Sequence, residues 1–288
     1  MKRVGAIGMG TMGAPMAANI ARAGLPVMVY NRTIEKAQPL AQTGALVAET
    51  LRDLFEWADV VVLVLAGPAA IDEILSGESA SLDLLRGKVV VNMGTVAPLY
   101  SQTLSSRLEA AGIAYAEAPV FGSKKPAEEG TLVVLSAGDL DILAGLQSIF
   151  DAVGKKTVLC GKVPAGMATK LGTNLLLTAH IEALAETLHF VERAGGSPEA
   201  YLDIVLSGPV ASDFYRMKAP KFLNRDHSPQ ASIIRATEGL RSVVETASRT
   251  GAFVPGAVAD LELYERAINS GLSNEDVTAI VEVLESHE

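Results

Sequence analysis

A glycine-punctuated motif near the start of the sequence leaves few folds open to the rest of the chain. An apolar stretch at residues 3–7 runs into Gly8-Met9-Gly10-Thr11-Met12-Gly13, and apolar residues at helical spacing follow, as far as Gly24. A second apolar stretch over residues 26–30 completes a strand–helix–strand unit. In this setting the first glycine permits a tight turn, the second admits a pyrophosphate and the third packs helix against strand. The motif therefore predicts a Rossmann fold with a dinucleotide phosphate on the helix N-terminus.

The residues at the end of the second strand bear on which dinucleotide is bound. NAD sites place Asp or Glu roughly twenty residues after the glycines, where it binds the ribose 2′-hydroxyl. This chain has Asn31-Arg32-Thr33 instead. An uncharged residue followed by Arg suits a 2′-phosphate, because guanidinium binds phosphate through charge-assisted hydrogen bonds. The sequence predicts NADP(H); a solvated loop arginine is the alternative interpretation of Arg32.

The alternation of strands and helices continues beyond this unit and predicts an α/β fold with a parallel sheet. The apolar run at residues 59–65 indicates a buried strand, and Leu65 and Ala66 follow at its carboxyl end, where such sheets bind ligands. Thr95 closely follows the next strand. The other expected elements are a helix over residues 34–42, a short helix containing Trp57, and strands at 45–48, 88–92, 114–118, 131–136 and 157–159.

Residues 117–132 contain two prolines and two glycines, which predict a rigid loop rather than a helix. Its exposed amides, together with Ser123, Lys124 and Lys125, are suited to hold a small carboxylate. A solvated lysine pair is an equally good interpretation of Lys124 and Lys125.

The stretch from Pro164 to Gly195 predicts one helix roughly 45 Å long. Lys170 and Asn174 head one face of this helix, and that face continues as aliphatic core through Leu177, Ile181, Leu184 and Leu188. A lysine at the head of a buried stripe either extends its ammonium to water or is placed for chemistry. Further helices are expected near residues 199, 212–218, 233–249 and 257–270, with Ser197 as an N-cap and Ser273-x-x-Asp276 as a capping box for a last one.

Length and composition limit the remaining classes of protein. The 288 residues and 49% hydrophobic content predict two domains, which we place at residues 1–163 and 164–288. A net charge of −9 argues against nucleic acid as a partner. One cysteine, no membrane-length apolar run and a strand-like start predict a cytoplasmic protein without membrane contact. No metal is expected, because the spacing of the histidines does not match a metal-ligand pattern. The histidines are His180, His189, His227 and His287.

Three segments together resemble the β-hydroxyacid dehydrogenases. They are the glycine motif with Met12-Gly13, the loop APVFGSKKPAEEGTL at 118–132, and GMATKLGTN at 166–174. The loop is most similar to that of the glyoxylate and succinic semialdehyde reductase branch. The resemblance extends from Lys2 to about Gly271 and implies a Rossmann domain, a long interdomain helix and an all-α C-terminal domain. It also implies a homodimer or homotetramer, because that second domain usually mediates dimerisation.

The resemblance assigns roles to residues at the matching positions. It implies that Lys170 is the catalytic group, that Asn174 assists it one turn on, and that Thr95 contacts cofactor and substrate. The loop residues Phe121, Gly122 and Ser123 are implied to bind substrate. Chemistry agrees with the role of the lysine, since an ammonium can stabilise the oxygen of a carbonyl that receives hydride and then donate a proton to it.

The chain departs from the family pattern at three places and leaves its substrate open. Phe121 replaces a serine that helps to hold a substrate carboxylate, Glu238-Gly239 replaces Lys-Asp, and Ala231 stands near a common aromatic position. The leading hypothesis is an NADPH-dependent reductase of small aldehydes or keto acids. Reduction of imines or bulkier uncharged carbonyls is a second hypothesis, and a catalytically silent NADP-binding scaffold is a third.

Overall fold

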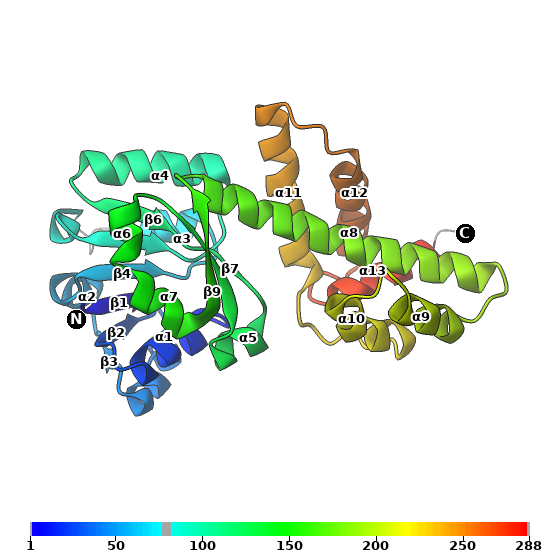
Figure 1. The fold of residues 1–288 in the computed structure, drawn as a ribbon, viewed down its shortest axis with the longest axis horizontal. Helices are drawn as coiled ribbons and strands as arrows, with labels where there is room; N and C mark the ends of the chain where they lie inside the picture. Colours follow the sequence, from blue (N-terminus) through cyan, green and yellow to red (C-terminus); the bar gives the residue numbers. More distant parts are fainter. Residues whose placement is uncertain (1, 77–81, 287–288) are drawn as a thin grey trace. The chain divides into compact units, whose positions relative to one another are not determined.

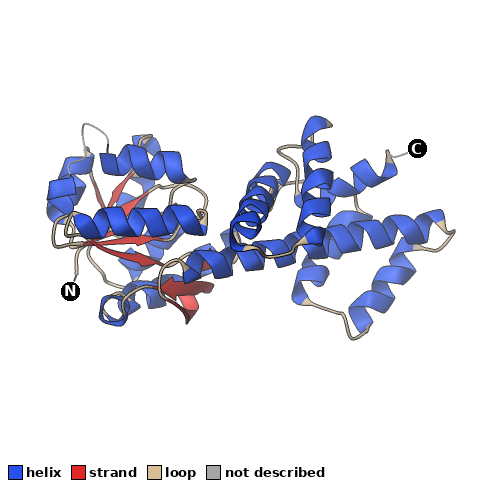
Figure 2. Cartoon of the chain, turned by 90° about the horizontal axis from the view of Figure 1, so that it is seen from above, coloured by secondary structure: helices blue, strands red, loops and turns tan. Residues whose placement is uncertain are grey.

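The computed structural model describes residues 2–76 and 82–286 and divides the chain into two compact units, Met1–Lys170 and Leu171–Glu288. The division falls between Lys170 and Leu171, whereas the sequence analysis placed the domain boundary between residues 163 and 164. In the described residues, all strands belong to the first unit and the second is built of helices (Figures 1 and 2). The predicted α/β fold with an all-α second part is therefore confirmed.

The first unit is organised around a sheet in which nine strands are described. Its parallel part has the order β3-β2-β1-β4-β5-β6, so the order reverses between β1 and β4 (Figure 1). In doubly wound sheets, ligands bind outside the carboxyl ends of the strands at such a reversal. The bounds are β1 Val4–Ile7, β2 Val27–Tyr30, β3 Leu46–Val47, β4 Val60–Leu63, β5 Val89–Asn92 and β6 Ala114–Glu117.

The far edge of the sheet is mixed. Strand β8 (Leu132–Ala137) runs antiparallel to β6 and to the short β7 (Val120–Phe121), and β9 (Gly154–Gly161) pairs parallel to β8. The strands predicted at 131–136 and 157–159 correspond to β8 and β9.

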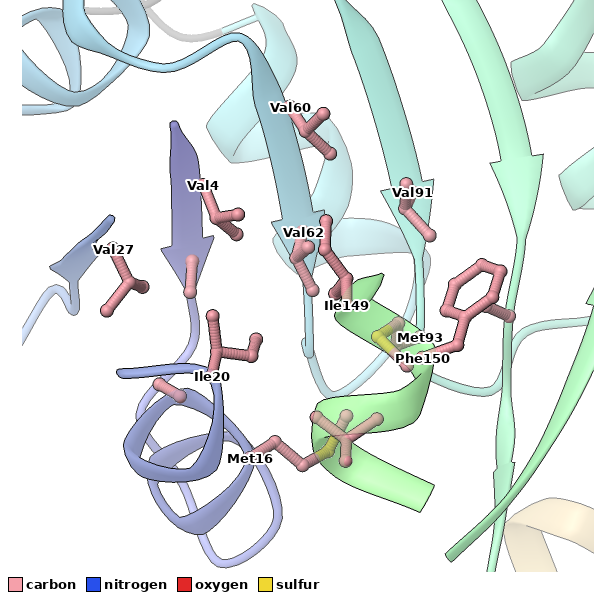
Figure 3. Close-up of a cluster of buried hydrophobic side chains, with 14 of the residues drawn as sticks. Val4, Met16, Ile20, Val27, Val60, Val62, Val91, Met93, Ile149 and Phe150 are labelled. Carbon is pink, nitrogen blue, oxygen red and sulfur yellow. The ribbon is translucent and has the colours of Figure 1, made fainter. Parts of the chain in front are cut away.

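Helices cover both faces of the sheet because its central strands are apolar on both sides. On one face, Val60 and Val62 of β4 point toward α1 (Gly13–Arg22) and α7 (Gln147–Val153), as Figure 3 shows. On the other face, Val61 and Leu63 belong to a second buried cluster. The helices packed there are α2 (Leu51–Trp57), α3 (Pro68–Ser76), η3 (Leu82–Leu85) and α4 (Pro98–Ala110). A further short helix, α6 (Leu140–Ala144), comes directly before α7 in the chain.

The helix predicted over residues 34–42 was wrong. The segment forms two separate 3₁₀ turns, η1 (Ile34–Lys36) and η2 (Gln38–Thr43), joined at Ala37. Pro39 explains the break, because it has no N–H with which to continue a helix from η1, and it stands instead in the first turn of η2.

The rigid loop predicted for residues 117–132 is also wrong in part, since it contains helix α5 (Lys124–Glu129). Pro126 lies in the first turn, where a missing N–H costs nothing. Gly130 ends the helix in the left-handed conformation, at φ 68°. Salt bridges of 3.7 Å and 3.8 Å link Lys124 to Glu128 and Lys125 to Glu129 along the helix.

The second unit packs helices around the apolar face of α8 (Ala165–Arg193), the long helix that the sequence predicted. Ser197 and Ser212 cap the next two helices, since their side chains accept hydrogen bonds from Ala200 N and Tyr215 N. The bounds are α9 Pro198–Ser207, α10 Asp213–Leu223, α11 Ile233–Thr250, α12 Pro255–Asn269, η4 Val277–Ala279 and α13 Ile280–Glu285.

The capping box proposed at Ser273-x-x-Asp276 is wrong. Asp276 is itself the N-cap of η4, where it accepts a hydrogen bond from Thr278 N. Its carboxylate is fully buried and accepts hydrogen bonds from Lys218 Nζ at 2.8 Å and 3.1 Å. Asp276 therefore joins α10 to the end of the chain as half of a buried ion pair.

Candidate active site

A cleft of about 610 Å³ opens at the carboxyl ends of β1, β2 and β4 in the first unit. This volume falls within the roughly 300–1,000 Å³ of ordinary ligand pockets. The structure brings together here most of the residues that the sequence assigned to the cofactor: Gly8, Gly10, Asn31, Arg32, Thr33, Leu65 and Ala66.

The three glycines of the motif differ in what surrounds them. A Cβ on Gly8 would lie 2.3 Å from the carbonyl oxygen of Val64, and one on Gly13 would lie 2.0 Å from that of Gly8. Gly8 and Gly13 are thus required for strand β4, the turn and helix α1 to pack. Gly10 is exposed and has nothing within 4 Å of its Cβ position, so a ligand can approach its backbone. This geometry fits a dinucleotide pyrophosphate.

Asn31 holds the glycine loop in place from the end of β2. Its Oδ1 accepts a hydrogen bond from Met9 N at 2.9 Å, and its Nδ2 donates to Thr33 O at 2.8 Å. An aspartate here could accept the first bond but could not donate the second. The side-chain amide of Asn31 therefore links the glycine loop, at Met9, to the turn that follows β2.

Arg32 extends from the rim of the cleft into solvent. Its side chain is 81% exposed and forms a salt bridge of 3.2 Å with Glu73 of α3. An exposed pair of this kind is weak, so the guanidinium can exchange Glu73 for a phosphate. Lys36 of η1 also lines the cleft and was missed by the sequence analysis. The sequence feature that could have indicated Lys36 is its position four residues after Arg32, in a segment expected to be helical.

Thr95 follows the end of β5. The preceding Gly94 N donates to Asn92 Oδ1 at 3.0 Å, and a Cβ on Gly94 would lie 2.7 Å from Leu65 O. The turn after β5 is therefore in contact with the turn after β4. Thr95 is exposed at this edge of the sheet, next to the segment that contains Leu65 and Ala66.

Lys170 lies near the start of α8 and is the last residue of the first unit. Its Nζ is 5.6 Å from the ring centroid of Phe121, within cation–π range. Burial lowers the pKa of the Lys170 ammonium to about 8. Phe121, which departs from the family pattern, thus contacts the predicted catalytic lysine.

Glu117 is a buried acid that the sequence analysis did not assign to the site. It is fully buried at the end of β6, and its Oε2 accepts a hydrogen bond from Met167 N, at 3.1 Å, in the first turn of α8. Burial raises the pKa of the Glu117 carboxyl, while the hydrogen bond from Met167 opposes the rise. Gly166 is needed beside it, since a Cβ there would lie 2.9 Å from Oε2. The sequence feature that could have indicated Glu117 is an acidic residue in an otherwise largely apolar strand.

The remaining residues of the predicted substrate loop are exposed. Gly122 adopts φ +136°, and a Cβ there would lie 2.7 Å from Leu132 Cδ2, so glycine is required. Ser123 precedes α5 without capping it. Lys124 and Lys125 lie along the exposed side of α5, in the salt bridges described above.

Asn174 belongs to the helical unit, one turn after Lys170 along α8. It is half-buried and lines a separate cavity of about 230 Å³ together with Gly239 and Ala231. Glu238, the neighbour of Gly239, is exposed and accepts a hydrogen bond from Arg235 at 2.8 Å.

Neither metal ligands nor membrane spans are found in the part of the chain that the structure describes. No group of three or more His, Cys, Asp or Glu side chains there is arranged to hold a metal ion. His227 instead contacts Glu282 at 2.8 Å, and His287 lies outside the described residues. No described helix has the length and apolar character needed to cross a membrane.

Comparison with known proteins shows the family of this chain. Residues 3–161 match the family model of the NAD binding domain of 6-phosphogluconate dehydrogenase, and residues 164–284 match that described as NAD-binding of NADP-dependent 3-hydroxyisobutyrate dehydrogenase. Together with the cleft, these matches define an NAD(P)-dependent oxidoreductase that acts on CH–OH or C=O groups. The chain belongs to the β-hydroxyacid dehydrogenase family.

Individual relatives extend over nearly the whole chain. Chloroplastic glyoxylate/succinic semialdehyde reductase 2 of Arabidopsis thaliana is 32% identical over 98% of this chain and 79% of its own. The 2-hydroxy-3-oxopropionate reductase of Escherichia coli is 29% identical over 98% and 97%. The structure of Mycobacterium tuberculosis 3-hydroxyisobutyrate dehydrogenase has the same fold, with a TM-score of 0.89 at 23% identity, over 99% of this chain and 100% of that one.

Proposed function

We propose that this chain reduces the carbonyl group of a small aldehyde or keto acid with NADPH, and that Lys170 donates the proton. The observation that carries the proposal is the setting of Lys170, whose pKa burial lowers to about 8 beside the ring of Phe121. A general acid works best when its pKa lies near the pH at which the enzyme operates. A lysine with its ordinary pKa near 10.4 would release its proton less readily.

The residues of the cleft have separate tasks in this proposal. The backbone of Gly8 to Gly13 holds the pyrophosphate, Arg32 and Lys36 hold the 2′-phosphate, and the turns at Ala66 and Thr95 hold the nicotinamide end. The bound cofactor supplies the hydride to the carbonyl carbon. Lys170 stabilises the charge that develops on the carbonyl oxygen and then transfers a proton from Nζ to that oxygen. Burial of Lys170 disfavours the charged form of its amine and so favours proton release.

The preference for NADPH is supported by two cations and by the uncharged Asn31 at the end of β2. Arg32→Ala should raise the KM for NADPH about five- to tenfold and change that for NADH less than twofold. Arg52→Ala is the matched control, because Arg52 is also an exposed, ion-paired arginine, in a salt bridge with Glu56. Equal changes for both cofactors would show that Arg32 does not contact the 2′-phosphate.

The reaction itself is tested by NADPH oxidation with glyoxylate, succinic semialdehyde, an uncharged aldehyde and a cyclic imine. The names of the relatives favour the small acids, whereas Phe121 in place of serine removes a carboxylate donor and favours an uncharged substrate. Preferential turnover of the imine would establish the second hypothesis. Cofactor binding without turnover of any of the four would contradict the proposal and support a silent scaffold.

We also propose that the helical unit associates with a second copy of the chain, as a homodimer or within a homotetramer. Large apolar side chains are exposed on this unit, and Phe253 (90% exposed) and Phe190 (68%) are examples. Association with a second copy would remove such side chains from water, which is favourable. Sedimentation at micromolar concentration should show a dimer or tetramer, and a monomer of about 30 kDa would contradict this proposal.

A further inference from the structure

An acidic side chain lies at the cofactor cleft, among residues that are otherwise suited to bind phosphate. Ala70, Glu73 and Ile74 of α3 line this cleft. Residues three and four positions apart share one face of a helix, so a single face of α3 is turned toward the cleft. Among the described residues that line it, Glu73 is the only anion, and the cations are Arg32 and Lys36. A carboxylate therefore stands where the proposed function requires a site for the 2′-phosphate.

Glu73 is paired with the guanidinium to which the proposed function assigns that phosphate. Its Oε2 and Oε1 lie 3.2 Å and 3.4 Å from Arg32 Nη1. The two residues are 41 positions apart in the sequence, so the pair joins the turn after β2 to helix α3. The pair of Arg52 and Glu56 differs in this respect, because both of its members belong to helix α2 and neither lines the cleft.

A carboxylate and a phosphate bind a guanidinium in the same way. Each accepts charge-assisted hydrogen bonds from its N–H groups. A 2′-phosphate that binds Arg32 must therefore displace Glu73 or lie beside its negative charge, and both outcomes are less favourable than binding to a cleft with a neutral residue at position 73. NADH carries a hydroxyl in place of the 2′-phosphate and avoids this competition.

We propose that Glu73 is a specificity-determining residue, which competes with the 2′-phosphate of NADPH for Arg32 and so narrows the preference of this chain for NADPH over NADH. The inference rests on the proposed function, in which Arg32 binds the 2′-phosphate, and it adds an opposing determinant on α3. Glu73 holds Arg32 in the free protein, and binding of NADPH exchanges the carboxylate for the phosphate. Because NADH leaves the ion pair undisturbed, the cleft remains open to both dinucleotides.

Binding of cofactor fragments tests this inference without the reaction. 2′-Phospho-ADP-ribose carries the 2′-phosphate but no nicotinamide, and ADP-ribose lacks both. In calorimetry, Glu73→Gln should tighten the binding of 2′-phospho-ADP-ribose about three- to fivefold, the scale of an exposed ion pair, and should change that of ADP-ribose less than about twofold. The gain should be smaller at about 0.5 M NaCl than at about 0.05 M, because salt screens exposed charges.

Glu56→Gln is the matched control, because Glu56 is similarly exposed and also paired with an arginine. This substitution should leave the binding of both fragments unchanged. A double-mutant cycle then tests the competition itself. In an Arg32→Ala background, Glu73→Gln should change the binding of 2′-phospho-ADP-ribose less than about twofold, because carboxylate and phosphate no longer share a guanidinium. An equal gain with and without Arg32 would overturn the inference.

Kinetics should agree with the binding measurements, and the two together separate this inference from the proposed reaction. Glu73→Gln should raise the ratio of kcat/KM for NADPH to that for NADH about three- to fivefold. If Glu73→Gln tightens 2′-phospho-ADP-ribose but no carbonyl compound is reduced, the proposed reduction fails while the competition stands. If Arg32→Ala weakens 2′-phospho-ADP-ribose and Glu73→Gln does not tighten it, the inference is overturned and the assignment of Arg32 is intact.

Discussion

Burial lowers the pKa of Lys170, near the start of α8, and of Lys218, in α10 of the helical unit. Lys218, in the helical unit, is 2% exposed, and its charge is held by Asp276 and Gln230. Lys170 lies beside the ring of Phe121, with a pKa lowered to about 8. An ammonium fixed by a carboxylate contributes to the fold, whereas one with a pKa near neutrality is suited to release its proton. The comparison teaches that the surroundings of a buried lysine, rather than its burial, indicate its role.

The largest effect should come from removing the Lys170 amine. Lys170→Ala should lower kcat/KM by ~10²–10⁴-fold, the usual contribution of a positioned proton donor, with NADPH binding retained. Lys170→Arg should restore little, because a guanidinium keeps its proton at neutral pH. Steady-state kinetics and NADPH fluorescence titration measure the two effects. A Lys170→Ala variant with near-normal turnover would contradict the role of proton donor that distinguishes Lys170 from Lys218.

Removing the other lysine should affect stability. Lys218→Ala leaves the Asp276 carboxylate buried without its cation, so the free energy of unfolding should fall by about 3–5 kcal/mol. Urea denaturation of the variant measures this loss. In the double variant Lys218→Met, Asp276→Leu, only part of the loss should be recovered, because the unpaired charge is gone but Gln230 N and Ala231 N lose the acceptor of their hydrogen bonds. A single variant as stable as the parent would show that the pair contributes nothing to the fold.

A smaller effect of opposite sign is expected from Lys170→Met. The folded-state pKa of Lys170 lies below its unfolded value near 10.4, so the desolvated ammonium destabilises the fold fully below about pH 8 and less as the pH rises toward 10.4. The variant should therefore gain about 1–3 kcal/mol at pH 7 and less at pH 10. Denaturant unfolding at the two pH values tests this, and a loss of stability at pH 7 would contradict it.

The mildest test changes only the pH. The proton donor is the charged form of Lys170, so kcat/KM for reduction should be level below about pH 8 and should fall up to about tenfold per unit above it. The decline should disappear in the residual activity of Lys170→Ala. A profile that rises through pH 8 would indicate a general base instead.

The fold of this chain was largely predictable because its main signals are local. The glycine motif, the valine-rich strands and the long proline-free stretch before Gly195 each depend on neighbouring residues. Helix α5 was missed for a local reason as well. Proline and glycine ordinarily break a helix, but Pro126 stands in the first turn of α5 and Gly130 just past its last residue.

The contacts around the site were less predictable because they join distant parts of the sequence. Glu117 and Met167 are 50 residues apart, and Lys218 and Asp276 are 58 apart. A charged residue in a sequence is ordinarily expected at the surface, and only the fold supplies the partner that permits its burial. Phe121 and Lys170 were both noted from the sequence, but their contact was not.

The hydrogen bond between Glu117 and Met167 also fixes the rotational phase of α8. A helix turns by about 100° for each residue, so a slip of one position would swing Lys170 a quarter of a circle or more around the axis. Met167 precedes Lys170 by less than one turn. The Glu117 carboxylate at the end of β6 therefore fixes the orientation of the part of α8 that carries Lys170. The direction in which the ammonium points is thus set in part from the sheet, through one hydrogen bond to the first turn of α8.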